Sequence, residues 1–206
     1  MSERTTGIRS VLSMAAAYRF TQNAIGAEKA RRIVAADYIR ATPGSRVFDI
    51  GSGTSDILEH LPAVEYFGLE PSESYVAAAR SRFGRRVTIV HGGVDDFDPA
   101  PWESSCDVVV SVGVLHHLTD EQAETLLTSA ATLLRPAGRF IAIDPCLQQG
   151  QSRIARALIV RDRGQNVRTQ AGSEDLIHGI FKTSRVTVRH DLLRFPYTHS
   201  IIEATA

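Results

Sequence analysis

The chain is poor in several residue types, and each shortage excludes a class of protein. Its 206 residues include two cysteines, Cys106 and Cys146, whose spacing fits neither a zinc site nor a disulfide framework. The sequence has no run of 18 apolar residues, and its first residues hold no apolar stretch followed by a cleavage site. We therefore expect a cytoplasmic protein with two buried thiols and no membrane partner.

An excess of charge of either sign is also missing. Lys plus Arg and Asp plus Glu both total 23, so the chain has no global basic field that would gather nucleic acid. The 43% of hydrophobic and 22% of charged residues are ordinary for a soluble globular domain. We expect no nucleic-acid partner, and the oligomeric state is not readable from the sequence.

The sequence does contain a regular alternation of strand-like and helix-like segments from residue 45 onward. This alternation predicts an α/β fold with a parallel sheet covered by helices on both faces. Strands are expected at Arg46–Ile50, Glu65–Glu70, Arg86–His91, Cys106–Val112, Arg139–Asp144, Thr183–Arg189 and Tyr197–Glu203. Helices are expected at Ser55–Leu61, Ser72–Phe83 and Asp120–Leu134, with amphipathic pieces at Ile154–Val160 and Ser173–Phe181.

We expect one domain, 1–206, in four parts. Residues 1–40 form a helical cap with helices at Ile8–Phe20 and Ala27–Ile39, and residues 41–144 form the ligand-binding core. Residues 145–182 are an Arg-rich insertion on the substrate side, and residues 183–206 form a terminal strand hairpin. The prediction is a Rossmann-like three-layer sandwich whose seven-stranded, mostly parallel sheet has its last strand antiparallel.

A glycine-rich turn follows the first predicted strand. Gly51 and Gly53 allow the backbone to approach a ligand closely, and Asp49 stands two places before Gly51. Because ligands of such sheets bind beyond the carboxyl ends of the strands, Glu70 after the second strand is placed to accept hydrogen bonds from a ribose diol. A glycine turn and an acid at this spacing predict a nucleoside site.

Two kinds of nucleoside ligand compete for this turn. A dinucleotide needs a third small residue for its pyrophosphate, whereas Asp56 stands at that position and is expected to point its negative charge at the pyrophosphate, which it would repel. Asp49, in contrast, suits the ammonium group of a ligand with an amino-acid end. A nicotinamide-dependent oxidoreductase is further disfavoured because lysine occurs only at Lys29 and Lys182, which leaves no plausible Tyr-x-x-x-Lys pair.

From about residue 34 to the C-terminus, the chain resembles the class I S-adenosylmethionine-dependent methyltransferases. The turn Asp49-Ile50-Gly51-Ser52-Gly53-Thr54, the fourth-strand stretch Asp107 to Leu118 and the turn Leu133 to Arg139 carry the resemblance. It implies S-adenosyl-L-methionine as cofactor and methyl transfer to a small-molecule acceptor. The implied cofactor-binding residues are Asp49, Gly51, Ser52, Gly53, Thr54, Glu70, Pro71, Gly93, Val94, Asp95, Ser111 and Val112.

Three residues depart from the family's pattern. Ser55 replaces a frequent third glycine, a change that we expect to be small because serine fits beside a helix N-terminus. Gly93 stands where many members have an acidic or amide residue, so that Asp95 or the Val94 backbone is expected to contact adenine. Ala137 replaces a glycine, which bears on the geometry of a turn rather than on chemistry.

Candidate catalytic and acceptor-binding residues follow other strands. His116 and His117 come after the fourth strand, where one could act as a general base or merely cover the cofactor. We expect no metal site, and orientation of the acceptor can account for much of the rate without a base. Tyr18, His190 and Tyr197 are candidate acceptor contacts, although ordinary packing explains them too.

Other interpretations remain open at this point. The arginines of the insertion could bind an anionic acceptor or form a solvated face. The chain could also be a non-catalytic module that binds S-adenosylmethionine. An RNA or protein acceptor is a further alternative, although the sequence shows no added nucleic-acid module.

Overall fold

Seven strands form one sheet in the order β3-β2-β1-β4-β5-β7-β6. The computed structural model describes residues 26–161 and 166–206. Neighbouring strands from β3 to β5 are parallel, whereas β7 runs antiparallel between β5 and β6. The predicted fold, a mostly parallel seven-stranded sheet with its last strand antiparallel, is confirmed. Its strands are β1 (Arg46–Ile50), β2 (Glu65–Glu70), β3 (Val87–His91), β4 (Cys106–Val112), β5 (Leu134–Pro145), β6 (Thr183–Arg189) and β7 (His199–Thr205).

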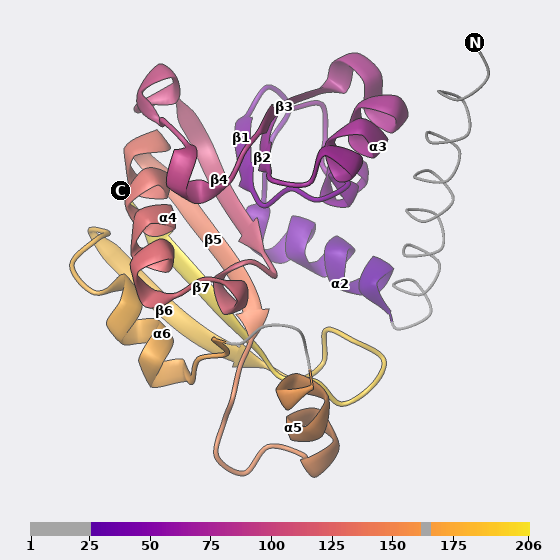
Figure 1. Cartoon of the computed structure of the whole chain (residues 1–206), viewed down its shortest axis with the longest axis vertical. Coiled ribbons are helices and arrows are strands. Elements are labelled where there is room, and N and C mark those ends of the chain that lie inside the picture. The colour runs from indigo at the N-terminus through magenta and orange to yellow at the C-terminus, as the bar shows by residue number, and fades with distance from the viewer. Residues whose placement is uncertain (1–25, 162–165) are drawn as a thin grey trace.

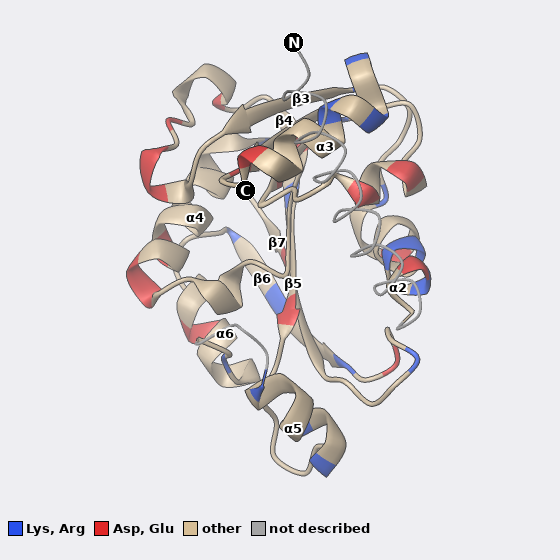
Figure 2. Cartoon of the chain, turned by 45° about the vertical axis from the view of Figure 1, so that its right-hand side comes forward, with Lys and Arg blue, Asp and Glu red and all other residues tan. Residues whose placement is uncertain are grey.

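Helices cover both faces of the sheet. Figure 2 shows the strands nearly edge-on, with α2 and α3 on one side and α4 and α6 on the other, and α5 lies beyond the end of β5 (Figure 1). The α-helices are α2 (Ala27–Ile33), α3 (Glu73–Phe83), α4 (Asp120–Leu133), α5 (Arg153–Val160) and α6 (Gln170–Ile177). A π-helical segment, η1 (Val34–Ile39), continues α2, and short 3₁₀ helices are η2 (Asp56–His60), η3 (Gly84–Arg86), η4 (Val94–Asp96), η5 (Ala100–Trp102) and η6 (Leu115–His117).

Capping residues explain where two of the long helices begin. The Ser72 hydroxyl accepts a hydrogen bond from the Tyr75 backbone N–H ahead of α3. Thr119 and Gln122 form a reciprocal capping box at the start of α4. Both starts are where the sequence predicts them. The predicted helix at Ile8–Phe20 lies outside the described residues, and the one at Ala27–Ile39 is α-helical only to Ile33.

Two hydrophobic cores, one on each face, follow from the alternation of side chains along the strands. Val47, Val108 and Ile141 point to the core beneath α2 and α3. Their strand neighbours Phe48 and Val109 point to the core beneath α4 and α6. Both cores are needed because a parallel sheet buries both of its faces.

One edge of the sheet gathers the segments in which the sequence predicts a site. Since β1 to β6 all run in the same direction, their carboxyl ends lie together, and β7 starts from the same edge. The connections leaving that edge are residues 51–55, 71–72, 92–96, 113–119, 146–152 and 190–198. Four of these six connections each contain at least one residue that is predicted to bind the cofactor or the acceptor.

The fifth strand is longer than predicted. It begins at Leu134 rather than Arg139, and its register shifts between Cys106 and Val108 of β4. Ala137 occupies this added stretch with a left-handed φ of 64°. The segment expected to be a turn is thus an irregular strand start, in which a side chain sits in a conformation that favours glycine.

We expect Ala137→Gly to stabilise the fold by about 0.5–1 kcal/mol, because glycine removes the left-handed penalty that alanine carries at this position. Urea denaturation measures the change. Ala131→Gly, inside α4, is the matched control and should destabilise by roughly 1 kcal/mol. Destabilisation of similar size by both variants would contradict the interpretation of Ala137.

Candidate functional site

The glycine turn is pinned to the neighbouring strand. The backbone N–H groups of Gly51 and Ser52 both donate to the Leu69 carbonyl, at 2.8 and 3.0 Å. Gly51 has a φ of 77°, and a Cβ placed there would lie 2.3 Å from Val114 Cγ2. Any other residue would therefore be strained and would clash, so this glycine is required by the turn itself.

Glu70 connects the turn to the start of α3. Its buried carboxylate accepts one hydrogen bond from the Gly53 N–H and another from the Ser72 N–H, each 2.9 Å long. A carboxylate has about four acceptor positions, so two donors leave capacity for a ligand's hydroxyl groups. Gly53 has φ 53°, and a Cβ at this position would meet nothing within 4 Å, which leaves open space beside the carboxylate.

Asp49 is a buried acid without a cationic partner among the described side chains. It is 4% exposed, and the Tyr66 hydroxyl donates a 2.5 Å hydrogen bond to its Oδ2. Burial raises the pKa of Asp49 from 3.8 to about 7, against the lowering effect of the Tyr66 bond and together with the nearby charge of Glu70. A cationic ligand group would stabilise the ionised form.

The remaining predicted cofactor contacts border this turn in different ways. Ser111, at the end of β4, is fully buried and its hydroxyl has no partner among the described residues, whereas Val112 beside it is 42% exposed. A Cβ at Gly93 would meet open space. Asp95 accepts a hydrogen bond from Gln122 of α4. Ser52 and Thr54 are buried, Val94 is partly buried, and the Pro71 carbonyl lies 3.0 Å from His91 Nε2.

Two expectations about the end of the glycine turn are wrong, one about the charge of Asp56 and one about Ser55. Asp56 does not point a free charge at a ligand, because it forms ion pairs with Arg31 and Arg82. Ser55 is not a minor replacement for glycine, since its φ of 56° is left-handed. The predicted helix after the turn is only the five-residue 3₁₀ helix η2. Such a short helix has too small a dipole at its N-terminus to bind a pyrophosphate well.

His116 is held by an acid from the next strand. Its Nδ1 lies 2.7 Å from Asp144 Oδ1, and the same oxygen accepts the His116 backbone N–H at 3.1 Å. Both side chains are buried. Burial raises the pKa of Asp144, and the hydrogen bonds and charge of His116 oppose that shift. His117 stacks obliquely on this ring, with centroids 3.9 Å apart.

Two of the predicted acceptor contacts line one cleft. His190 and Tyr197, in the β6–β7 connection, border a space of about 530 Å³ together with residues of the 145–152 loop and α5. The full lining is Gly150, Gln151, Ser152, Ala155, His190, Leu193, Arg194, Phe195, Pro196, Tyr197 and Thr198. Tyr197 precedes β7 rather than lying in it, and Tyr18 lies outside the described residues.

The arginines of the insertion have different environments. Arg168 is not free to meet an anionic acceptor, because its guanidinium donates to the Leu115 and Leu118 carbonyls and to Asp120. Arg153 and Arg156 are exposed on α5, in agreement with a solvated face. Arg163 lies outside the described residues.

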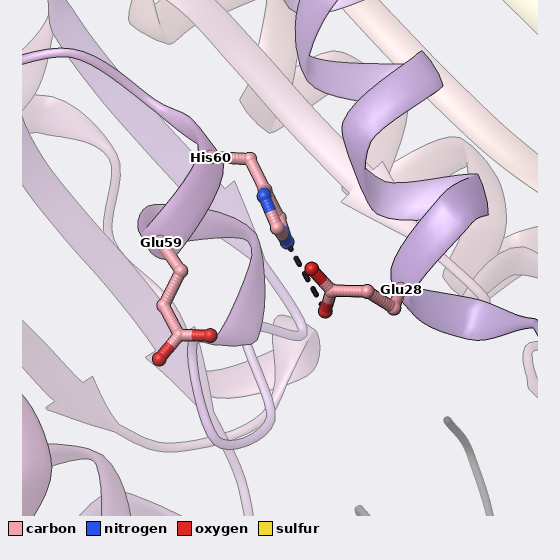
Figure 3. A group of neighbouring side chains, drawn as sticks. All are labelled: Glu28, Glu59 and His60. Atoms are coloured by element: carbon pink, nitrogen blue, oxygen red, sulfur yellow. Dashed lines mark ion pairs between the residues drawn. The ribbon is translucent and has the colours of Figure 1, made fainter. Parts of the chain in front are cut away.

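One group of potential metal ligands comes together from segments distant in sequence. Glu28 of α2 and the η2 residues Glu59 and His60 place ligand atoms within 4.8 Å of one another, and Figure 3 shows His60 facing Glu28. Arg82 pairs with Glu59, and Arg31 lies 3.9 Å from Glu28. Because arginines already balance these acids, we assign no metal role to the group.

Sequence reasoning missed three residues that shape the site. Tyr66 supports Asp49, Asp144 holds His116, and Gly68 makes room for Ser52, whose Oγ would lie 2.6 Å from a Cβ at position 68. The sequence does hold signals for two of them. A tyrosine in a buried strand needs a hydrogen-bond partner, and Asp144, like Glu70, is an acid at a strand's carboxyl end.

Comparison with known sequences gives a consistent result. Residues 47–138 match the family model described as a methyltransferase domain. A protein of Geobacillus sp. strain WCH70, described as an uncharacterized methyltransferase, is 27% identical over 183 residues, which cover 82% of this chain and 85% of that protein. A Bacillus velezensis protein of the same description is 30% identical over 110 residues, which cover 52% of this chain and 51% of the relative.

Solved structures share the fold. The Haemonchus contortus phosphoethanolamine N-methyltransferase 2, in complex with phosphomonomethylethanolamine and S-adenosylhomocysteine, has a TM-score of 0.69 at 14% identity over 85% of this chain and 52% of its own. The apo S-adenosylmethionine-dependent methyltransferase SibL has a TM-score of 0.68 at 17% identity, with coverages of 85% and 54%. Residues 47–138 thus carry a methyltransferase domain, and the chain has the fold of the class I methyltransferases.

The matched part of this methyltransferase, residues 47–138, contains the glycine turn, Glu70, the η4 segment and His116. It ends before Asp144 and before the three segments that line the cleft, namely the loop after β5, α5 and the β6–β7 connection. The described residues include no helix long and apolar enough to cross a membrane.

The raised pKa of Asp49 gives this methyltransferase a defined pH dependence of stability. The unfolded chain releases the Asp49 proton near pH 3.8, whereas the folded chain keeps it to about pH 7. The folded state holds more protons in this window, so Asp49 lowers the free energy of unfolding as the pH rises from 4 to 7.

Asp49→Asn removes this dependence. We expect its unfolding free energy, relative to the wild type, to increase by roughly 2–3 kcal/mol between pH 5 and pH 8 in the absence of ligand, since one pKa unit corresponds to about 1.4 kcal/mol. Urea titrations at the two pH values measure this difference. Glu124→Gln, on the exposed side of α4, should show none, and parallel curves for Asp49→Asn and wild type would contradict the assignment.

Proposed function

We propose that this methyltransferase uses S-adenosyl-L-methionine to methylate a small-molecule acceptor. The observation that carries the proposal is the arrangement of Asp49 and Glu70 around an open glycine turn. Strand β1 pairs with β2 in parallel register, Ile50 opposite Leu69, so both acids reach the same edge of the sheet. They offer separate anchors for an ammonium group and a ribose diol.

The residues present fit such a cofactor. Asp49 would meet the ammonium group of its amino-acid end, which would compensate a carboxylate that is buried without a cation from the described part of the chain. Glu70 would accept the ribose hydroxyls, and the free space at Gly53 would admit the chain of atoms between them. Ser111 offers a buried hydroxyl that has no partner among the described residues. When bound, the cofactor supplies an electrophilic methyl group on a sulfonium ion.

The other predicted contacts complete this proposal. Gly51, Ser52 and Thr54 shape the turn, Pro71 follows Glu70, and Val112 would be covered by the bound ligand. Gly93, Val94 and Asp95 would surround the adenine, with Asp95 already held by Gln122. The main contribution of the protein would be orientation. Holding the methyl donor and the acceptor in line, away from water, is a large part of what such a transfer requires.

Isothermal titration with S-adenosylhomocysteine tests the cofactor assignment. We expect the wild type to bind and Asp49→Ala and Glu70→Ala to bind at least about tenfold more weakly, because each removes one charged hydrogen-bonding anchor. Glu124→Ala serves as the surface control. Absence of binding by a folded wild type, or equal binding by all four proteins, would overturn the proposal.

We also propose that the acceptor enters the cleft lined by His190 and Tyr197. The cleft has a volume typical of small-molecule sites. Its lining combines aromatic and apolar side chains with Gln151, Ser152 and Thr198, contains Arg194, and has no acidic residue among those that the structure describes. This lining suits a neutral or anionic molecule better than a cationic one, and it assigns residues 145–182 and 183–206 to the acceptor side.

Substitutions in the cleft should separate acceptor binding from cofactor binding. We expect His190→Ala and Tyr197→Ala to lower the formation of S-adenosylhomocysteine, with a panel of small phenols, amines and carboxylic acids, by at least about tenfold through lost orientation. Their affinity for S-adenosylhomocysteine should not change. Lys182→Ala, outside the cleft, is the control, and wild-type turnover in both cleft variants would refute this placement.

A further inference from the structure

The carboxylate at the end of β5 holds the histidine that follows β4. Asp144 Oδ1 makes two contacts with one residue: it lies 2.7 Å from the ring Nδ1 and accepts a hydrogen bond from the backbone N–H at 3.1 Å. Both residues are 6% exposed. Asp144 Oδ2 has no partner among the described residues. The interaction therefore fixes the position of His116 and the rotation of its ring together.

The backbone around His116 is held from the other side as well. The Asn166 N–H donates to the His116 carbonyl at 3.0 Å. Arg168 donates to the carbonyls of Leu115 and Leu118, at 2.7 and 3.2 Å, and its charge pairs with Asp120. The 3₁₀ helix η6 is thus clamped between the end of β5 and the segment after α5, so the imidazole is preorganised.

These contacts point to a role beyond packing. An ionised carboxylate can only accept, so a short bond to Nδ1 requires a proton on that nitrogen and leaves the lone pair of a neutral ring on Nε2. In water the neutral ring of histidine favours the tautomer with its proton on Nε2, so a ring protonated on Nδ1 has to be selected by a partner such as Asp144. Carboxylate–imidazole pairs of this kind orient a ring and stabilise its protonated form.

We propose that Asp144 is a positioning residue that holds His116 with Nδ1 protonated, so that His116 Nε2 accepts the proton that the acceptor loses on methylation. The proposal rests on the proposed function, because it needs an acceptor with an O–H or N–H group. It assigns to His116, rather than His117, the general-base role that the sequence leaves undecided between them.

The step balances without a further reactant. A lone pair on the acceptor oxygen or nitrogen forms the new bond to the methyl carbon, and the carbon–sulfur bond breaks with its electrons left on sulfur. The proton from the acceptor moves to His116 Nε2. The resulting imidazolium faces Asp144 at 2.7 Å, where the carboxylate stabilises its charge until the proton passes to solvent.

Nitrogen NMR of the protein labelled with ¹⁵N-histidine tests the geometry without any acceptor. The wild type should show neutral His116 with a protonated Nδ1 and an unprotonated Nε2, assigned through the loss of its signals in His116→Gln. Asp144→Asn should change the tautomer, whereas Asp107→Asn, at the start of β4, should not. A wild-type His116 protonated on Nε2 would overturn the proposal, even if Asp144→Asn failed to fold.

Turnover tests the chemistry and separates it from a purely structural role. We expect Asp144→Asn to lower kcat about 10–100-fold while the affinity for S-adenosylhomocysteine is unchanged, with partial recovery in Asp144→Glu. His116→Gln should lose at least as much, and His117→Gln less. Full kcat in Asp144→Asn would refute the role of Asp144.

Failure of the proposed function gives a different result. A folded wild type that neither binds S-adenosylhomocysteine nor methylates any member of the panel overturns the function and the general-base role together. The ¹⁵N spectrum would then still report whether Asp144 sets the tautomer, so a wrong function and a wrong ring geometry are told apart.

Discussion

The parallel pairing of β1 with β2 and β4 is the constraint on which the site depends. Asp49 lies opposite Gly68 on one side and Val110 on the other, so the ends of three strands are in register. That register brings Asp49, Glu70 and Ser111 to one edge of the sheet. The two hydrogen bonds from the turn to Leu69 and the Glu70 bond to Gly53 then fix the loop above that edge.

Much of this arrangement is predictable because it follows from local rules. Strands β1, β2, β4 and β6 begin and end at the predicted residues, since each is a short apolar or β-branched run bounded by turn residues. The helix starts at Ser72 and Thr119 follow from capping side chains. The glycine turn and Glu70 are identifiable because strand ends and ligand sites coincide in this class of sheet.

The parts that were missed depend on contacts between segments far apart in sequence. Asp56 looks like a free charge until α2 and α3 bring Arg31 and Arg82 to it. Arg168 looks like one of several surface arginines until the fold places it on the carbonyls of η6. Ala137 and Ser55 occupy left-handed backbone, and no pattern in the sequence marks a residue other than glycine as doing so.

Three buried acids at strand ends illustrate how this protein divides one kind of side chain among different tasks. Glu70 is satisfied by two backbone N–H groups and keeps its ordinary hydrogen-bonding capacity for a ligand. Asp144 pairs one oxygen with the ring of His116 and leaves the other without a partner among the described residues. Among the residues that the structure describes, Asp49 receives only a neutral hydroxyl, that of Tyr66. Its burial makes the ionised form costly at neutral pH, a cost that the ammonium group of the proposed cofactor would offset. These different degrees of compensation agree with the three roles proposed above, a ribose anchor for Glu70, a support for a base for Asp144 and an ammonium anchor for Asp49.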